Sequence, residues 1–272
     1  MTAKEGERPT ILHPTDFGRE GNLAFAHALK IALRLHGSLS LLHLQTADAL
    51  EPKVSAVKRA LDTLAAWKLL PAGADETELE RRLDVKLAGF SLPARNAREG
   101  ILDYIEDHAC DLAVLASRKR KGLQHWLDPS VAEKAVKRAR TMILFLREGV
   151  RGFVSPSGMI GLRNVLVPLD ERLDAEAAIR RIETFANKMS QGVALHFLHV
   201  GPKAPAASAH KLILRDGPVV ETIIDQAERL SADLIAVPTG GHSGLLGALR
   251  GSVTAKILDE SRWPVLSVPA HS

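Results

Sequence analysis

The chain has 272 residues, of which 46% are hydrophobic and 25% charged, and its formal net charge is +4 at pH 7. This composition is ordinary for a globular protein, with no apolar run long enough to span a bilayer and no signal peptide in residues 1–10. The mild basic excess and the 4% aromatic content disfavour a nucleic-acid partner, and a single cysteine cannot form an internal disulfide, so we expect a cytoplasmic protein without membrane attachment.

The first elements along the chain are two short strands separated by a helix. Residues 10–13 form a mainly apolar run, which is followed by Pro14 and Asp16. Residues 41–44 form a second run of this kind, and we expect both to be strands. Strands are also expected at 111–117 and 142–146. Apolar side chains between the first two strands recur roughly at helical spacing, namely Leu23, Ala26, Leu29, Leu33 and Leu35.

Two further segments of the first half are less regular. Residues 51–82 are predicted to be helical, with a break at Pro71 to Gly73. The expected apolar stripe of this segment consists of Val54, Val57, Leu61, Leu64 and Leu69. Residues 149–163 contain four glycines, a proline and two serines, which indicates a linker.

The second half repeats the first in the same order. Asp16 and Asp170 are 154 residues apart, and His43 and His199 are 156 apart. Three later pairs are each 122 apart, namely Asp111 with Asp233, Ser130 with Ser252, and Leu144 with Leu266. A single change of spacing, of 34 residues, indicates that the first copy has extra chain after its second strand. We therefore predict two tandem domains, 1–150 and 164–272, joined by a linker at 151–163.

Each copy alternates short strands with helices, and this pattern predicts an α/β fold. The strands are nearly continuous runs of Val, Ile and Leu, as is typical of strands that are covered on both faces. We expect an open parallel sheet with helices on both faces, built from right-handed crossovers. The edges of the strands at 142–146 and 264–268 are where we expect the two copies to pair about a pseudo-twofold axis.

Ligands of such sheets bind beyond the carboxyl ends of the strands. In the second copy the residues at these positions are Pro168, Leu169 and Asp170, then Val200, and then residues 238–244. The last segment is rich in glycine and leads to Gly251 and Ser252 before a predicted helix, an arrangement that favours an anion. A carboxylate such as Asp170 suits a ribose hydroxyl or an adenine amino group.

With these residues the chain resembles tandem members of the universal stress protein family, over nearly all of both copies. The nucleotide signature of that family is Gly-x2-Gly-x9-Gly-Ser/Thr after the fourth strand, and Gly241 with Gly251–Ser252 matches its latter part. The first glycine falls on Pro238, although Gly240 lies close by. The resemblance implies a Rossmann-like fold of the adenine nucleotide alpha hydrolase type, and ATP, with Mg²⁺ if the phosphates bring it.

The same resemblance assigns roles to residues of the second copy. Asp170, beside Pro168 and Leu169, would contact the base or ribose, and the backbone around Val200 would contact adenine. The phosphates would be lined by Gly241, His242, Gly244, Gly251, Ser252 and Val253, with Pro238, Thr239 and Gly240 leading into that loop.

The first copy retains Asp16, Gly122 and Ser130 but has lost the glycines of the signature, which fall on Ala116, Lys119 and Pro129. Because proline has no N–H, a phosphate donor is missing there, and we expect nucleotide binding of the usual kind to fail in this copy. The basic segment 118–121 is either a solvated loop or a site for an anion or a protein partner.

These observations favour a stress-response binding module whose second domain holds ATP or a related adenine nucleotide. No P-loop, general base or carboxylate cluster for a metal is evident, so we expect no enzymatic activity beyond slow ATP hydrolysis. The alternatives are a scaffold that binds no nucleotide and recruits a protein partner, and an enzyme with an acid or base near His242. A homodimer is a further possibility. We expect His43 and His199 to be packed strand histidines, and Cys110 to be a buried structural thiol.

Overall fold

The computed structural model describes residues 8–15, 21–45, 55–117, 141–171, 173–202, 210–240 and 253–270. The chain divides into two compact units. Unit 1 comprises residues 1–116 and 154–160, and unit 2 comprises residues 117–153 and 161–272. The division of the sequence into domains at 1–150 and 164–272 stays a prediction.

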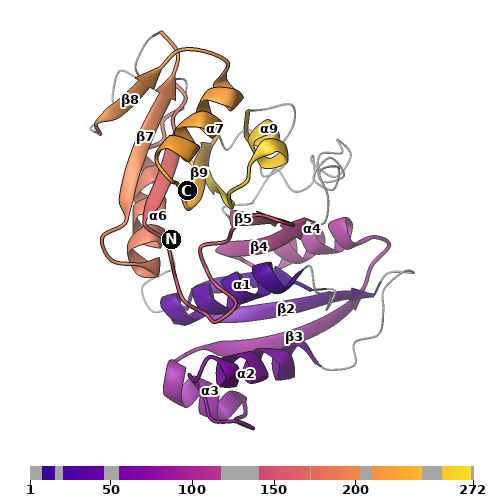
Figure 1. Ribbon diagram of the computed structural model, residues 1–272. Helices are drawn as coiled ribbons and strands as arrows, with labels where there is room; N and C mark the ends of the chain where they lie inside the picture. The colour runs from indigo at the N-terminus through magenta and orange to yellow at the C-terminus, as the bar shows by residue number, and fades with distance from the viewer. Residues whose placement is uncertain are drawn as a thin grey trace. The chain divides into compact units, whose positions relative to one another are not determined.

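Unit 1 contains a parallel sheet with the strand order β3-β2-β1-β4 (Figure 1). Its strands are β1 (Thr10–Pro14), β2 (Ser38–Gln45), β3 (Lys86–Pro93) and β4 (Leu112–Ser117). Its helices are α1 (Asn22–Leu35), α2 (Ala56–Ala66), α3 (Glu76–Leu83) and α4 (Ala97–Asp107). The helix predicted between the first two strands is therefore present as α1.

Helices lie on both faces of this sheet. A methyl group added at Gly89 would lie 3.2 Å from Val57 of α2, whereas the ring of the next residue, Phe90, lies 5.8 Å from that of Tyr104 in α4. Successive residues of a strand point to opposite faces, so α2 and α4 cover opposite faces of β3.

The helical segment predicted at 51–82 is present as α2 and α3, with the break where proline and glycine predicted it. The predicted stripe was partly wrong. The buried residues of α2 are Ala56, Ala60 and Leu64, whereas Leu69 lies beyond the end of the helix and is exposed. Val54 lies outside the described residues. Small alanines at two of the three buried positions allow α2 to pack closely.

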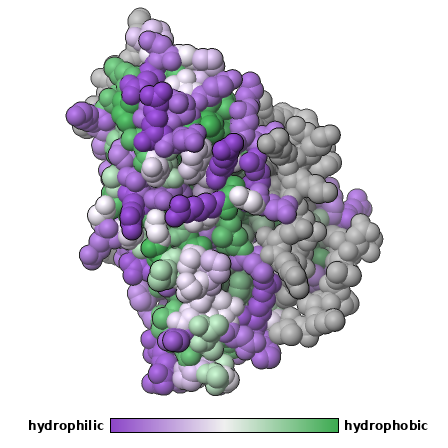
Figure 2. Space-filling view, viewed as in Figure 1, coloured by the Kyte–Doolittle hydropathy of each residue, from purple (hydrophilic) through white to green (hydrophobic). Residues whose placement is uncertain are grey.

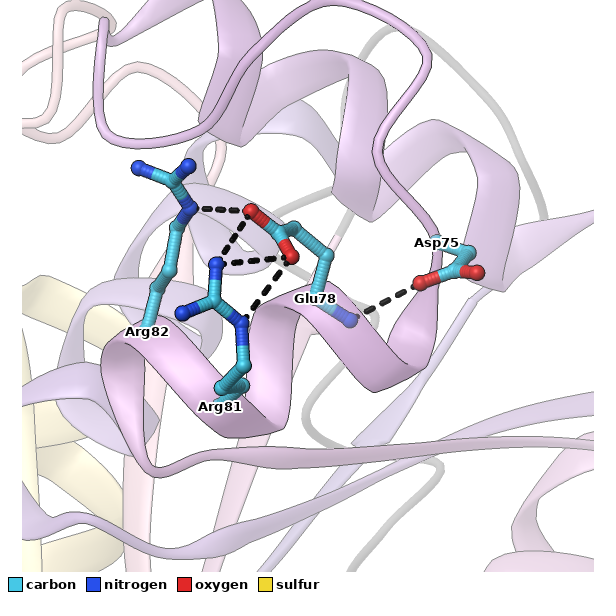
Figure 3. Close-up of polar contacts among 4 residues, drawn as sticks. All are labelled: Asp75, Glu78, Arg81 and Arg82. Carbon is cyan, nitrogen blue, oxygen red and sulfur yellow. Dashed lines mark hydrogen bonds and ion pairs between the residues drawn. The ribbon is translucent and has the colours of Figure 1, made fainter.

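The short helix α3 is held by local charges (Figure 3). The Asp75 carboxylate accepts a 2.8 Å hydrogen bond from the Glu78 amide and caps the helix. The Glu78 carboxylate in turn accepts hydrogen bonds from Arg82 and Arg81, which lower its pKa. These pairs are exposed and lie within one helix, so we expect them to stabilise α3 only slightly.

Unit 2 contains six strands in the order β5-β10-β9-β6-β7-β8. Its strands are β5 (Met142–Arg147), β6 (Asn164–Pro168), β7 (Ala194–Val200), β8 (Leu212–Arg215), β9 (Leu234–Thr239) and β10 (Val265–Pro269). Its helices are α6 (Glu176–Met189), α7 (Val219–Arg229) and α9 (Val253–Glu260). The strands from β6 to β10 are parallel, and right-handed crossovers place α7 and α9, which pack together, opposite α6 (Figure 1).

Strand β5 pairs antiparallel with β10, with Leu144 opposite Leu266. These are the last predicted strands of the two copies, at the edges where we expected pairing. Residues 142–146 of β5 are all buried, so the last strand of the first copy forms part of the core of unit 2.

The open, mostly parallel α/β fold predicted from the sequence is confirmed. Two strands were missed, namely β3 and β8, one in each copy. Each of them pairs with a single neighbour at the edge of its sheet. Gly89 and Ser91 interrupt the apolar pattern of β3, and the apolar run of β8 is short, from Leu212 to Leu214. Figure 2 shows hydrophilic and apolar residues interspersed on the visible face of the described residues. Among the described residues, no helix is both long and apolar enough to cross a membrane.

Candidate functional site

The predicted site residues lie at the carboxyl edge of the sheet in unit 2. Strand β6 has β7 on one side and β9 on the other, and all three are parallel. The chain passes from β6 to β7 and β8, and returns to β9 on the other side of β6. The carboxyl ends of β6 and β9 therefore flank a topological switch point, the usual ligand position of an open α/β sheet.

The segment after β6 is fixed through its backbone. Pro168 ends the strand, and the amide of the buried Leu169 donates a 2.8 Å hydrogen bond to the Leu198 carbonyl of β7. The Leu169 carbonyl accepts a 2.9 Å hydrogen bond from His199 Nδ1. Asp170 follows with an exposed side chain. The structure thus presents the Asp170 carboxylate at the sheet edge directly after a residue whose N–H and C=O are both hydrogen-bonded to β7.

Strand β7 ends at Val200, which is half-buried and pairs with Arg215 of β8. The amide of the next residue, Gly201, donates a 2.9 Å hydrogen bond to the Arg215 carbonyl. The backbone of Val200 therefore lies at the edge to which Asp170 belongs, one strand away.

Two residues expected in the loop after the fourth strand lie instead in the strand itself. Pro238 and Thr239 are the last two residues of β9, both buried, in register with Val268 and Pro269 of β10. The described β6–β9 pairs end at Leu166 and Ile235, so the missing N–H of Pro238 breaks no hydrogen bond to β6. The loop therefore begins at Gly240.

Gly240, where the loop after β9 begins, lies near the segment after β6. A methyl group at Gly240 would lie 3.6 Å from Leu173 Cδ1, an ordinary van der Waals distance. Gly241, His242, Gly244, Gly251 and Ser252 lie outside the described residues. Val253 begins α9 and is exposed. The structure thus brings Asp170, Val200 and Gly240 to one sheet edge and describes both ends of the predicted phosphate loop.

Unit 1 repeats the backbone pattern at its own first two strands. The Thr15 amide donates a 2.8 Å hydrogen bond to the Leu42 carbonyl, and His43 Nδ1 lies 3.2 Å from the Thr15 carbonyl. Asp16 and residues 118–121 lie outside the described residues.

His13 distinguishes unit 1, because Val167 occupies the matching position in unit 2. Its Nδ1 donates a 2.9 Å hydrogen bond to the Val114 carbonyl, and burial lowers its pKa to about 4. His13 Nε2 and His199 Nε2 are both buried without a hydrogen-bond partner in the described structure. The sequence predicted packed strand histidines at 43 and 199, and their burial confirms this. The hydrogen bonds of these histidines to the loop carbonyls were not predicted.

The described residues contain no group of three His, Cys, Asp or Glu side chains that could hold a metal ion. His196 and His199 have separate partners, since His196 Nε2 lies 3.1 Å from Asn164 Oδ1.

Comparison with known proteins points to one family. The sequence matches the model of the "Universal stress protein family" over residues 7–147 and 202–269. No curated protein matches it significantly.

Three solved structures align with almost the whole chain. A functionally unknown protein from Pseudomonas aeruginosa PAO1 is 18% identical, with a TM-score of 0.62 over 97% of this chain and 93% of that one. A universal stress protein from Archaeoglobus fulgidus DSM 4304 is 16% identical, with a TM-score of 0.61 over 98% of both chains. A putative universal stress protein from Pseudomonas aeruginosa UCBPP-PA14 is 18% identical, with a TM-score of 0.61 over 97% of this chain and 94% of that one. At these identities the likeness concerns the fold.

Proposed function

The chain belongs to the universal stress protein family, and on that premise we propose that it is a cytoplasmic stress-response module whose second repeat binds ATP or a related adenine nucleotide. The binding site is the carboxyl edge of the sheet in unit 2, between β6 and β9. The protein acts as a nucleotide-responsive binding module, and any ATP hydrolysis is slow.

The observation that carries this proposal is the proximity of the segments that follow β6 and β9. A methyl group added at Gly240 would lie 3.6 Å from Leu173 Cδ1, and Leu173 is three residues beyond the exposed Asp170. A carboxylate and the start of a glycine-rich loop therefore both lie at the topological switch point. Neither feature alone would indicate a nucleotide.

Each group has a role that suits its chemistry. Asp170 accepts hydrogen bonds from the ribose hydroxyls or the adenine amino group, and the Val200 backbone borders the adenine. The phosphates lie along Gly241, His242, Gly244, Gly251 and Ser252, before the first turn of α9 at Val253. Free amides and the helix dipole favour an anion at such a position. Mg²⁺, when bound, neutralises part of the phosphate charge.

The test is the nucleotide content of freshly purified protein, followed by calorimetric titration with ATP. We expect one equivalent per chain in the wild type and none in Gly251→Val, because a branched side chain would block the approach of a phosphate to the backbone. Asp170→Asn should weaken binding, and the matched Asp16→Asn in the first copy should not.

Two other results would change the assignment. Two equivalents per chain would show that the first repeat binds as well, through groups other than the glycines it lacks. If the purified protein contains no nucleotide and releases no heat on titration with ATP, the proposal is wrong. That result would favour a scaffold that recruits a protein partner.

A further inference from the structure

We propose that His199 is a positioning residue for the nucleotide site, because it holds the Leu169 peptide from which Asp170 projects. This inference rests on the proposed function of unit 2. His199 lies on β7, directly before Val200, and its side chain reaches across to the segment after β6. The imidazole thus connects the two strand ends that carry the proposed base and ribose contacts.

The hydrogen bond fixes the tautomer of the ring. A carbonyl oxygen can only accept, so His199 Nδ1 carries the hydrogen that it donates to the Leu169 carbonyl, 2.9 Å away. The Leu169 amide already donates to the Leu198 carbonyl of β7. Both polar groups of residue 169 are therefore bound to β7, and Asp170 starts from a peptide that cannot rotate without breaking one of these bonds.

The far side of the ring sets a second constraint. A methyl group at Gly201 would lie 3.0 Å from His199 Nε2, and Gly201 has a φ of +154°. The imidazole thus lies between the Leu169 carbonyl and the backbone of Gly201, the residue after Val200. One side chain thus lies beside the backbone that follows both β6 and β7.

A histidine is a costly way to fill this position if only packing is required. His199 is 4% exposed, and its Nε2 has no hydrogen-bond partner in the described structure. An unpaired buried acceptor is unfavourable, whereas a leucine would fill similar space without it. What the leucine could not do is donate a hydrogen bond to the Leu169 carbonyl.

The first repeat provides an internal control. His43 lies against the Thr15 carbonyl in the same arrangement, at 3.2 Å, in the copy where we expect no nucleotide. If these histidines serve folding alone, mutations of His43 and of His199 should have similar effects. A role in positioning predicts an effect on nucleotide binding from His199 and none from His43.

The test uses the full-length protein and two substitutions at each position. In His199→Asn the side-chain amide nitrogen stands where Nδ1 stands and can donate to Leu169, whereas His199→Leu has no donor. We expect ATP affinity to fall about tenfold in His199→Leu, roughly the effect of one lost hydrogen bond, and to stay within about threefold of wild type in His199→Asn. His43→Asn and His43→Leu should leave the ATP affinity unchanged.

The outcomes separate this inference from the proposed function. Absence of ATP binding by the wild type would overturn both. Normal binding by the wild type and by His199→Leu would overturn only the positioning role, and so would an equal loss in the Leu and Asn variants.

A measurement on the wild type covers the case in which a variant does not fold. Nitrogen-15 spectra of the histidine rings should show His199 with hydrogen on Nδ1, and its signals should shift on addition of ATP while those of His43 do not. A His199 ring unaffected by ATP would refute the proposal.

Discussion

The Nε2 atom of His27 accepts a 3.0 Å hydrogen bond from the backbone amide of Val154, a residue 127 positions further along the chain. The other ring nitrogen, Nδ1, donates to the Leu23 carbonyl at 2.8 Å. The imidazole is therefore neutral and in one tautomer. Through this bond residues 154–160, which contain the antiparallel bridge between Val154 and Ile160, are attached to α1 within unit 1.

This arrangement predicts a loss of stability in mild acid. Burial lowers the pKa of His27 and of His13 to about 4, well below the value near 6.5 of an unfolded histidine. Between those values the unfolded chain binds protons that the folded chain does not. The contribution of these two histidines to the free energy of unfolding is thus fully present above pH 6.5. It is lost as the pH falls toward 4, by up to about 1.4 kcal/mol per pH unit for each histidine.

Urea unfolding at pH 7.5, 6.5 and 5.5 would measure this dependence. In His27→Gln the titrating group is removed, while the side-chain oxygen can still accept from the Val154 amide. We expect this variant to lose about 1 kcal/mol less stability than the wild type between pH 6.5 and pH 5.5. An equal loss in both proteins would show that His27 does not contribute.

A second prediction concerns the contact between Gly158 and Trp67. The indole N–H of Trp67 donates a 2.8 Å hydrogen bond to the Pro156 carbonyl, and a methyl group at Gly158 would lie 2.5 Å from the ring. Gly158 also has a φ of +77°. Gly158→Ala should therefore destabilise unit 1 through both strain and overlap, by about 2–4 kcal/mol.

Gly73 is the matched control, because its φ is +80° in the same unit and an added methyl group would meet nothing within 4 Å. Gly73→Ala should cost only the strain of a left-handed alanine, about 1–2 kcal/mol. The two variants can be compared by urea unfolding followed by circular dichroism. Equal losses would mean that the ring moves aside at no cost.

The sequence predicted the strands that are repeated in both copies, except the edge strands β3 and β8. Helix α6 runs from Glu176 to Met189, over an uninterrupted apolar period. The stripe of the inserted segment failed at Leu69, since α2 ends at Ala66 and Lys68 has a left-handed φ of 60°. A periodic pattern does not show where a helix stops when no glycine or proline marks the place.

The sequence predicted which residues of the candidate site follow the strands. It did not predict the contacts between them. The apolar runs ending near Asp170 and Val200 predicted which residues reach the carboxyl edge. The bond from His199 to Leu169 joins residues 30 positions apart through a backbone carbonyl, which has no signature in the sequence. The exact end of β9 was also missed, because Pro238 usually marks a loop and here lies within the strand.

Cys110 should be unreactive in the folded protein. The structure shows Cys110 half-buried and not fully buried as expected, and this partial burial, with a further contribution from the charge of Asp111, raises the pKa of its thiol to about 12. At pH 8 the thiolate fraction is then about 10⁻⁴, and the thiolate is the reactive form. Ellman's reagent at pH 8 should therefore modify the native protein orders of magnitude more slowly than the urea-unfolded protein. Equal rates would contradict both the burial and the structural role of this thiol.

The crowding of Gly201 against His199 can be measured in a double-mutant cycle. Gly201→Ala should destabilise unit 2 because the new methyl group lies 3.0 Å from His199 Nε2 and the backbone has a φ of +154°. The same change in a His199→Ala background retains the backbone strain and removes the overlap. We expect its cost there to be smaller by about 1 kcal/mol, measured by urea unfolding. Strict additivity would show that the ring and the Gly201 backbone do not constrain each other.

ATP should slow amide hydrogen exchange in unit 2 and not in unit 1. A ligand present at about 100 times its Kd stabilises the folded state by about 2.7 kcal/mol, because it binds the folded form alone. If the site lies where β6, β7 and β9 end, amide hydrogen exchange in these strands should slow when ATP is added. Exchange in β1 and β2, which occupy the corresponding positions of unit 1, should not change. Gly251→Val should abolish the protection without altering exchange in the absence of ATP. Equal protection of β1 and β2 would place a second nucleotide in unit 1, in spite of the proline at position 129.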